Sequence, residues 1–170
     1  MDHRQIIRMA LEEYYEDLTR ALDGLTTEER RFQPGPESHH IDFTVWHMAR
    51  VEDNWIQGFG RDAEPVWTRD GWSGKFRMPP NEGGYGYTAE QVRDLPSFDL
   101  SDVIEYYESV RKETFAYLDT VDEDDLDHAP GRGYHLEMTV GKMFSHVIVE
   151  QAQHTGQVAY LRGLQRGLNE

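Results

Sequence analysis

Three side chains that can bind a metal ion stand out for their types and their spacing. Glu150 and His154 are four positions apart, so on a helix they lie one turn apart on the same face. His47 lies far earlier in the chain, in a segment with its own helical periodicity. Two imidazole nitrogens and one carboxylate suit zinc, nickel, iron or manganese, and three ligands leave positions open for water or substrate. The sequence therefore predicts a divalent-metal site formed by His47, Glu150 and His154.

The same residues have simpler interpretations. An inward-facing histidine is often a hydrogen-bonded core residue, and Glu150 could pair with His146, His154 or a neighbouring arginine. Glu150 and His154 fall within about 20° of the line through Met143 and Leu161 when the segment is drawn as a helix. A carboxylate on such an apolar stripe is costly unless it is paired or coordinated. A single bound ion explains the whole set.

Four long segments carry apolar residues at spacings of three and four, which predicts the helices that position these side chains. They cover about residues 2–24, 42–59, 100–121 and 139–164. No segment shows a convincing strand alternation. We therefore expect an all-α fold, a four-helix bundle that forms a single domain over residues 1–170.

The connection between the second and third of these helices, roughly residues 60–87, is too long for a simple turn. Its length permits a crossover instead of a simple up-and-down order. The connection contains several aromatic residues, which predict packing on the bundle, either as a substrate wall or lid or as a cover: Trp67, Trp72, Phe76, Tyr85 and Tyr87. Thr88 to Gln91 has the pattern of a capping box that opens a short helix ending before Pro96.

Composition excludes several classes of function. The chain has no cysteine, which rules out disulfides, zinc–thiolate sites and iron–sulfur clusters, so any thiol chemistry needs an external thiol. Its net charge of −15, from 17 basic and 32 acidic residues, argues against nucleic-acid binding. A secretory signal and a bilayer-spanning apolar run are both lacking, so we expect a cytoplasmic protein that does not bind membranes.

Two segments resemble a known family, the DinB-like (damage-inducible) bundle superfamily. The segment FTVWHMARVEDNW, which contains His47, is similar to the second helix of that family. The segment SHVIVEQAQHTGQVAYLRGLQRG is similar to its fourth helix, which typically reads His-x3-His-x3-His-x-Gly-Gln. The corresponding residues here are His146, Glu150, His154, Gly156 and Gln157.

The resemblance implies a four-helix bundle with one metal ligand from the second helix and two from the fourth. Carried over position by position, the ligands are His47, Glu150 and His154. Glu150 stands where a histidine is common, so an altered metal preference is expected, and His47, His146 and His154 form a rival ligand set.

Some members of the superfamily are thiol-dependent isomerases or transferases that use a low-molecular-weight thiol such as mycothiol or bacillithiol, and others are hydrolases. The resemblance therefore implies a metal-dependent enzyme with a small-molecule substrate. It is either a thiol-dependent transferase or isomerase, which uses a thiol cosubstrate, or a hydrolase. His146 and Gln157 are the candidates for catalytic proton handling or orientation beside the metal.

Two other functions stay open, because a fold does not fix a function. One is a non-catalytic metal-binding or stress-associated bundle, in which the ion stabilises the fold. The other is a metal-free helical interaction module. In that interpretation Ile148, Ala152 and Ala159 form a homodimer contact or pack against another helix.

Other polar residues have no predicted role. Arg50, Glu52 and Asp53 are interpreted as surface residues or pairs within their helix. His39 and His40 fall in a predicted loop, where we expect them to be solvated.

Overall fold

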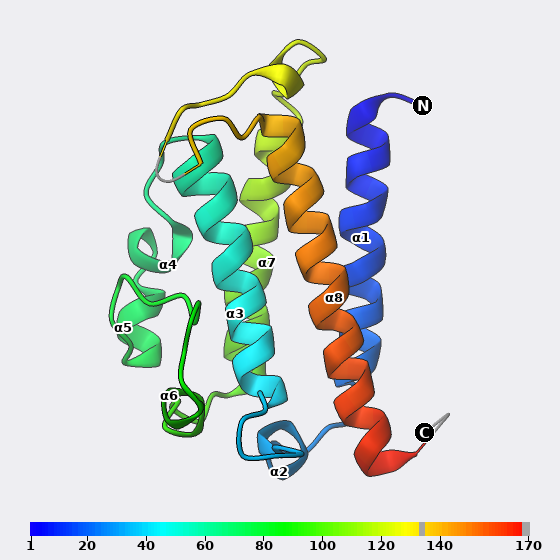
Figure 1. The fold of residues 1–170 in the computed structure, drawn as a ribbon, viewed down its shortest axis with the longest axis vertical. Helices are drawn as coiled ribbons and strands as arrows, with labels where there is room; N and C mark the ends of the chain where they lie inside the picture. The colour runs from blue at the N-terminus through cyan, green and yellow to red at the C-terminus, as the bar shows by residue number, and fades with distance from the viewer. Residues whose placement is uncertain (133–134, 168–170) are drawn as a thin grey trace.

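The long helices form a four-helix bundle, as the sequence predicts. The computed structural model describes residues 1–132 and 135–167, and that part of the chain is helical without any β-strand. The bundle consists of α1 (His3–Leu22), α3 (Ile41–Asp53), α7 (Leu100–Leu118) and α8 (Val140–Arg166). Helices α1 and α8 run in one direction, and α3 and α7 run in the other (Figure 1). Because α3 and α7 are parallel, the chain crosses over between them, as the long connection permits.

Shorter helices lie in the connections. They are α2 (Thr27–Arg31), α4 (Val66–Arg69), α5 (Trp72–Phe76), α6 (Ala89–Arg93) and the 3₁₀ turn η2 (Asp125–Asp127). The predicted capping box is present, since the Thr88 side chain accepts a hydrogen bond from the Gln91 backbone at the start of α6. Among the described residues, no helix combines the length and the apolar character that crossing a membrane requires.

The second predicted helix differs from the expectation in its last third. It is α-helical only to Asp53 and continues as the π-helix η1 (Asn54–Gly60). A π-helix carries an extra residue per turn, so it changes the register of the side chains that follow. An apolar stripe on a sequence does not reveal this change.

The crossover between α3 and α7 packs firmly on the bundle. Trp67, Trp72 and Phe76 are buried and join the hydrophobic core, whereas Tyr85 is 97% exposed. The Trp67 ring contacts those of Trp46 on α3 and Tyr106 on α7. The sequence predicts either a substrate wall or a cover for this segment. Residues 66–76 have the second role, since they cover the face that α3 and α7 form.

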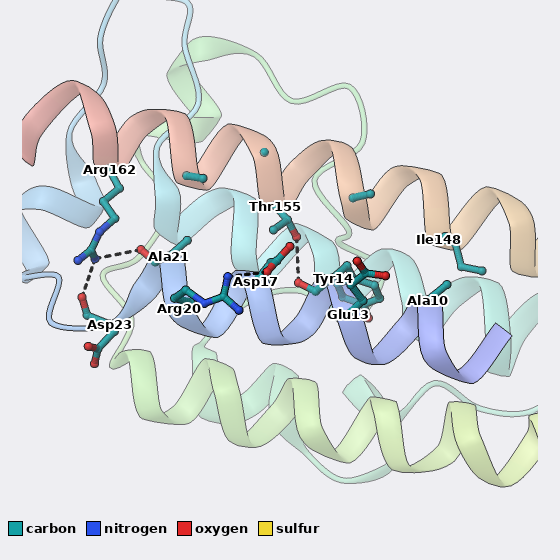
Figure 2. A pocket seen from close by; sticks show the side chains of 13 residues that line it. Ala10, Glu13, Tyr14, Asp17, Arg20, Ala21, Asp23, Ile148, Thr155 and Arg162 are labelled. Atoms are coloured by element: carbon teal, nitrogen blue, oxygen red, sulfur yellow. Dashed lines mark hydrogen bonds and ion pairs between the residues drawn. The ribbon is translucent and has the colours of Figure 1, made fainter. Parts of the chain in front are cut away.

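Helices α1 and α8 pack side by side but leave a groove of about 800 Å³ between them (Figure 2). Small side chains line it from both helices, among them Ala10 on α1 and Ala152 and Ala159 on α8. Ile148 and Ala152, with Ala159, therefore face α1. The homodimer contact predicted for these residues stays a prediction.

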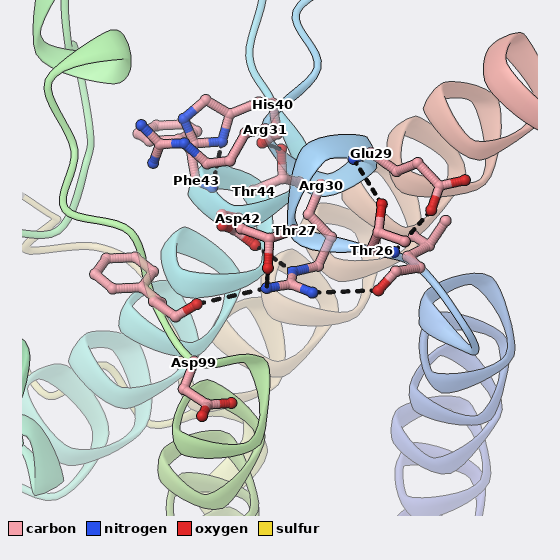
Figure 3. Close-up of polar contacts among 12 residues, drawn as sticks. Thr26, Thr27, Glu29, Arg30, Arg31, His40, Asp42, Phe43, Thr44 and Asp99 are labelled. Carbon is pink, nitrogen blue, oxygen red and sulfur yellow. Dashed lines mark hydrogen bonds and ion pairs between the residues drawn. The ribbon is translucent and has the colours of Figure 1, made fainter.

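A buried ion pair holds α2 against the start of α3 (Figure 3). The Arg30 guanidinium donates to the Asp42 carboxylate at 2.8 Å, and both side chains are almost fully buried. His40 is buried beside them and caps α3: its Nδ1 accepts from the Phe43 backbone, and its Nε2 lies 3.0 Å from the Val92 carbonyl. The expectation that His40 is solvated is wrong, because a histidine at a helix N-cap satisfies backbone groups instead of water.

The middle of α3 is buried on nearly every side, including its charged residues. Arg50, Glu52 and Asp53 are at most 2% exposed, so the expectation of surface residues is wrong. Arg50 and Asp53 do pair within the helix, at 3.1 Å. Asp53 also accepts from the Tyr106 hydroxyl and from two backbone amides of α4. The crossover covers Arg50 and Asp53, whereas Glu52 accepts a hydrogen bond from Tyr14 on α1. Periodicity within a single helix does not predict either contact.

Candidate metal centre

His47 lies in the middle of α3 and is held in one orientation. Its ring stacks on that of Phe43, and its Nδ1 lies 2.5 Å from the Gly83 carbonyl oxygen in the crossover. A carbonyl oxygen can only accept, so Nδ1 carries the proton and Nε2 keeps its lone pair. Burial lowers the pKa of His47 below its ordinary value, although the Gly83 hydrogen bond opposes that shift. A neutral imidazole with a fixed Nε2 lone pair is the form that binds a metal ion.

Glu150 and His154 approach His47 from α8. The Glu150 Oε1 atom lies 3.9 Å from His47 Nε2 and 3.6 Å from His154 Nε2. His154 Nδ1 is 2.8 Å from the Gln157 side-chain oxygen, so His154 also directs Nε2 towards Glu150. The structure thus brings together all three side chains that the sequence selects, and one ligand atom from each lies within 4.8 Å of the others.

Glu150 and His154 lie at the edge of the buried face of α8. The expectation that they lie on the apolar stripe through Met143 and Leu161 is therefore wrong. The buried polar positions of α8 are Gln151 and Thr155, while the side chains of Glu150 and His154 are 27% and 13% exposed. Helix α8 packs against both α1 and α3, so its buried arc is centred between the two helices. The cluster therefore faces the α3 side and remains reachable from solvent.

His146 extends the cluster by one turn towards the start of α8. Its Nε2 lies 3.2 Å from Glu150 Oε2, the oxygen that faces away from His47 and His154. Its ring packs against Trp55, which belongs to the π-helical segment η1, at a centroid distance of 4.8 Å. His146 is 40% exposed. It contacts the acid rather than the point where the other two imidazoles converge.

The crossover contributes two residues that the sequence analysis missed. Gly83 supplies the carbonyl that orients His47, and Gly84 adopts a left-handed φ of +81° directly after it. A Cβ atom at Gly84 would lie 2.9 Å from His47 Nδ1 and 3.1 Å from the Phe43 ring. Only glycine combines that backbone conformation with so close an approach. The Gly-Gly pair was the available signal, but nothing local connects it to His47.

The arrangement fits a divalent ion. Ligands at about 2.1 Å from a tetrahedral ion lie about 3.4 Å apart. The Glu150 Oε1 atom, at 3.9 Å from His47 Nε2 and 3.6 Å from His154 Nε2, is already close to that spacing. Both imidazoles have a hydrogen-bonded Nδ1, which is the usual outer support of metal-bound histidines. Among the described residues, Glu150 forms ion pairs with histidines and with no lysine or arginine. The cluster therefore presents lone pairs around a point that lacks a permanent cation.

The fold and the cluster together define a class of protein: a DinB-like all-α bundle with a His–Glu–His group between its second and fourth long helices. The model of the mycothiol-S-transferase family matches residues 6–167, so the chain belongs to that family, which is DinB-like. A conserved protein of Enterococcus faecalis has a similar crystal structure, with a TM-score of 0.86 and 23% identity over 96% of this chain and 97% of that one. No curated protein matches the chain.

Proposed function

We propose that this protein is a metal-dependent thiol S-transferase in which His47, Glu150 and His154 bind the metal ion. The observation that carries the proposal is the convergence of these side chains in a chain of the mycothiol-S-transferase family. Zinc, nickel, iron and manganese all suit two imidazoles and one carboxylate. The family description indicates mycothiol as the thiol cosubstrate, and the absence of cysteine agrees with a thiol that comes from outside the chain.

A divalent ion held by His47, Glu150 and His154 would lower the pKa of a bound thiol and so supply a thiolate at neutral pH. The protein contributes rigidity and proton handling. Gly83 and Gln157 fix the two imidazoles, which keeps both Nε2 atoms directed at one point. His146, at 3.2 Å from Glu150 and partly exposed, is placed to accept the thiol proton and pass it to solvent. The sulfur then forms a bond to an electrophilic carbon, and the leaving group departs with the electron pair of the broken bond.

The experiment uses protein that has never contacted nickel resin. Its metal content is measured by mass spectrometry, and it is then assayed with mycothiol and a bromomethyl electrophile that releases bromide. We expect close to one divalent ion per chain and thioether formation that depends on the enzyme. His47→Ala should lose both while keeping its helical circular dichroism, whereas His128→Ala, at an exposed site outside the cluster, should keep both. Metal-free wild-type protein, or turnover that survives in His47→Ala, would contradict the proposal.

A purely structural metal is the second candidate, because the ligands come from two helices, α3 and α8, that an ion would bridge. In that case chelation unfolds the bundle and no thiol or ester substrate is turned over. In the enzyme, chelation abolishes turnover while the apolar core keeps the bundle folded.

A further inference from the structure

A second cavity lies beside the cluster and has no role in the function proposed above. It measures about 240 Å³ and lies between the α2–α3 connection and the C-terminal half of α8. We call it the α3–α8 pocket. Its lining residues are Pro34, Glu37, Ser38, His39, Thr44, Gln157, Tyr160 and Leu161.

The pocket lies one helical turn from the cluster on both helices. Thr44 comes three residues before His47 on α3, and Gln157 comes three residues after His154 on α8. Since α3 and α8 are antiparallel, both steps lead in the same direction, by about 5 Å. A ligand held in the pocket can therefore extend a short arm to the point where the imidazoles converge.

Gln157 connects the two sites chemically. Its side-chain oxygen is bound to His154 Nδ1, so its amide nitrogen remains as the polar atom available to a ligand in the pocket. Tyr160 is 66% exposed at the pocket, and its ring and hydroxyl are accessible. An aromatic ring beside a few hydrogen-bonding groups is typical of sites that bind polar, ring-shaped ligands.

The charge of the pocket limits which ligands it can accept. Its described lining residues include no lysine or arginine, and Glu37 contributes a negative charge at its rim. The chain as a whole carries a net charge of −15. Phosphate and carboxylate groups are therefore repelled, whereas hydroxyl groups can donate to Glu37 and accept from Gln157.

We propose that the α3–α8 pocket binds the uncharged, hydroxyl-bearing part of the thiol cosubstrate and so selects a sugar-linked thiol over thiols that carry carboxylates or phosphates. The proposal rests on the function proposed above. The pocket volume is below the roughly 300–1,000 Å³ of sites for drug-sized ligands, which fits one ring of such a thiol and not the whole molecule. The end of the cosubstrate that carries the thiol then reaches the metal centre.

The test measures binding, with thiols whose sulfur is methylated so that it cannot become a thiolate. S-methyl mycothiol and S-methyl glutathione are titrated into the protein by calorimetry. We expect wild type to prefer the sugar-linked compound. Tyr160→Ala should weaken its binding about fivefold or more, the loss of roughly one hydrogen bond or ring contact. Tyr85→Ala, which removes an exposed tyrosine that does not line the pocket, should leave it unchanged.

A charge reversal tests the selectivity. Glu37→Lys should narrow the preference for S-methyl mycothiol over S-methyl glutathione by about fivefold. Glu123→Lys makes the same change of charge between α7 and η2, at the opposite end of the bundle, and should have no effect. Equal binding of both compounds to wild type, or unchanged binding in both pocket variants, would overturn the pocket assignment even if the enzyme transfers thiols. Pocket-dependent binding without turnover would instead leave this assignment standing and refute the proposed function.

Discussion

The His47 Nδ1 atom and the Gly83 carbonyl oxygen are 2.5 Å apart, which joins the middle of α3 to the crossover 36 residues later. The bond fixes the tautomer and the ring plane of the imidazole, so the crossover has a part in the metal centre that its distance in sequence conceals. The next residue, Gly84, lets the backbone come close enough to form this bond.

Gly84→Ala should therefore weaken metal binding more than it weakens the fold. The new Cβ would meet His47 Nδ1 at 2.9 Å and push the ring out of position. We expect about 10- to 100-fold lower metal affinity, as when an outer-shell partner is lost, measured by competition with a chromogenic chelator. Gly86→Ala is the matched control, since Gly86 also has a positive φ, of +70°, but has no atom within 4 Å of its Cβ position. Equal losses of affinity in both variants would show that backbone strain alone is responsible.

Substituting Glu150 and His146 one at a time distinguishes the two candidate sets of metal ligands. Glu150→Gln should lower metal affinity by at least about 100-fold, because it removes a charged ligand at the point where the imidazoles converge. His146→Gln should retain the metal and lose turnover, since the His146 imidazole pairs with the Glu150 oxygen that His47 and His154 do not share. Metal content by mass spectrometry and thioether formation are measured on the same preparations. Metal loss in His146→Gln with retention in Glu150→Gln would favour His47, His146 and His154 as ligands.

The sequence was informative where the determinants are local and periodic. The long helices, the capping box at Thr88 and the placement of Glu150 and His154 on one face of α8 all follow from spacing. The α2 helix escaped prediction because five residues are too few to show a period, although its capping box of Thr26 and Glu29 is legible in retrospect. The burial of Arg50 and the roles of Gly83 and Gly84 depend on how the crossover folds back on α3, and no helical pattern encodes that contact.

The buried Arg50–Asp53 pair should be essential for stability. Arg50→Met would leave the Asp53 carboxylate in the core without its cation, which costs about 3–5 kcal/mol in the free energy of unfolding. Urea unfolding monitored by circular dichroism measures this cost. Arg20→Met breaks an exposed pair with Asp17 and should change the free energy of unfolding by less than about 0.5 kcal/mol. Similar stabilities of the two variants would mean that Asp53 is sufficiently held by Tyr106 and the amides of α4.

His40 should make the bundle sensitive to mild acid. Burial is the main cause that lowers the pKa of His40 from 6.5 to about 4, with Arg31 acting in the same direction. Between these two pH values the unfolded chain binds more protons at this site than the folded chain does. The contribution of His40 to stability is therefore complete above pH 6.5 and is lost as the pH falls towards about 4. Protonation would also remove the Nδ1 lone pair that caps α3, the helix that carries His47.

His40→Asn isolates this contribution, because asparagine is a good N-cap that does not titrate. At pH 7 the variant should lose about 1 kcal/mol with the hydrogen bond to Val92. As the pH is lowered from 6.5 to about 4, its free energy of unfolding should fall less than that of wild type, with urea titrations at each pH as the measurement. His128→Asn, at an exposed position, should follow the wild-type curve. Parallel curves for wild type and His40→Asn would show that the acid sensitivity arises from carboxylates and not from the cap of α3.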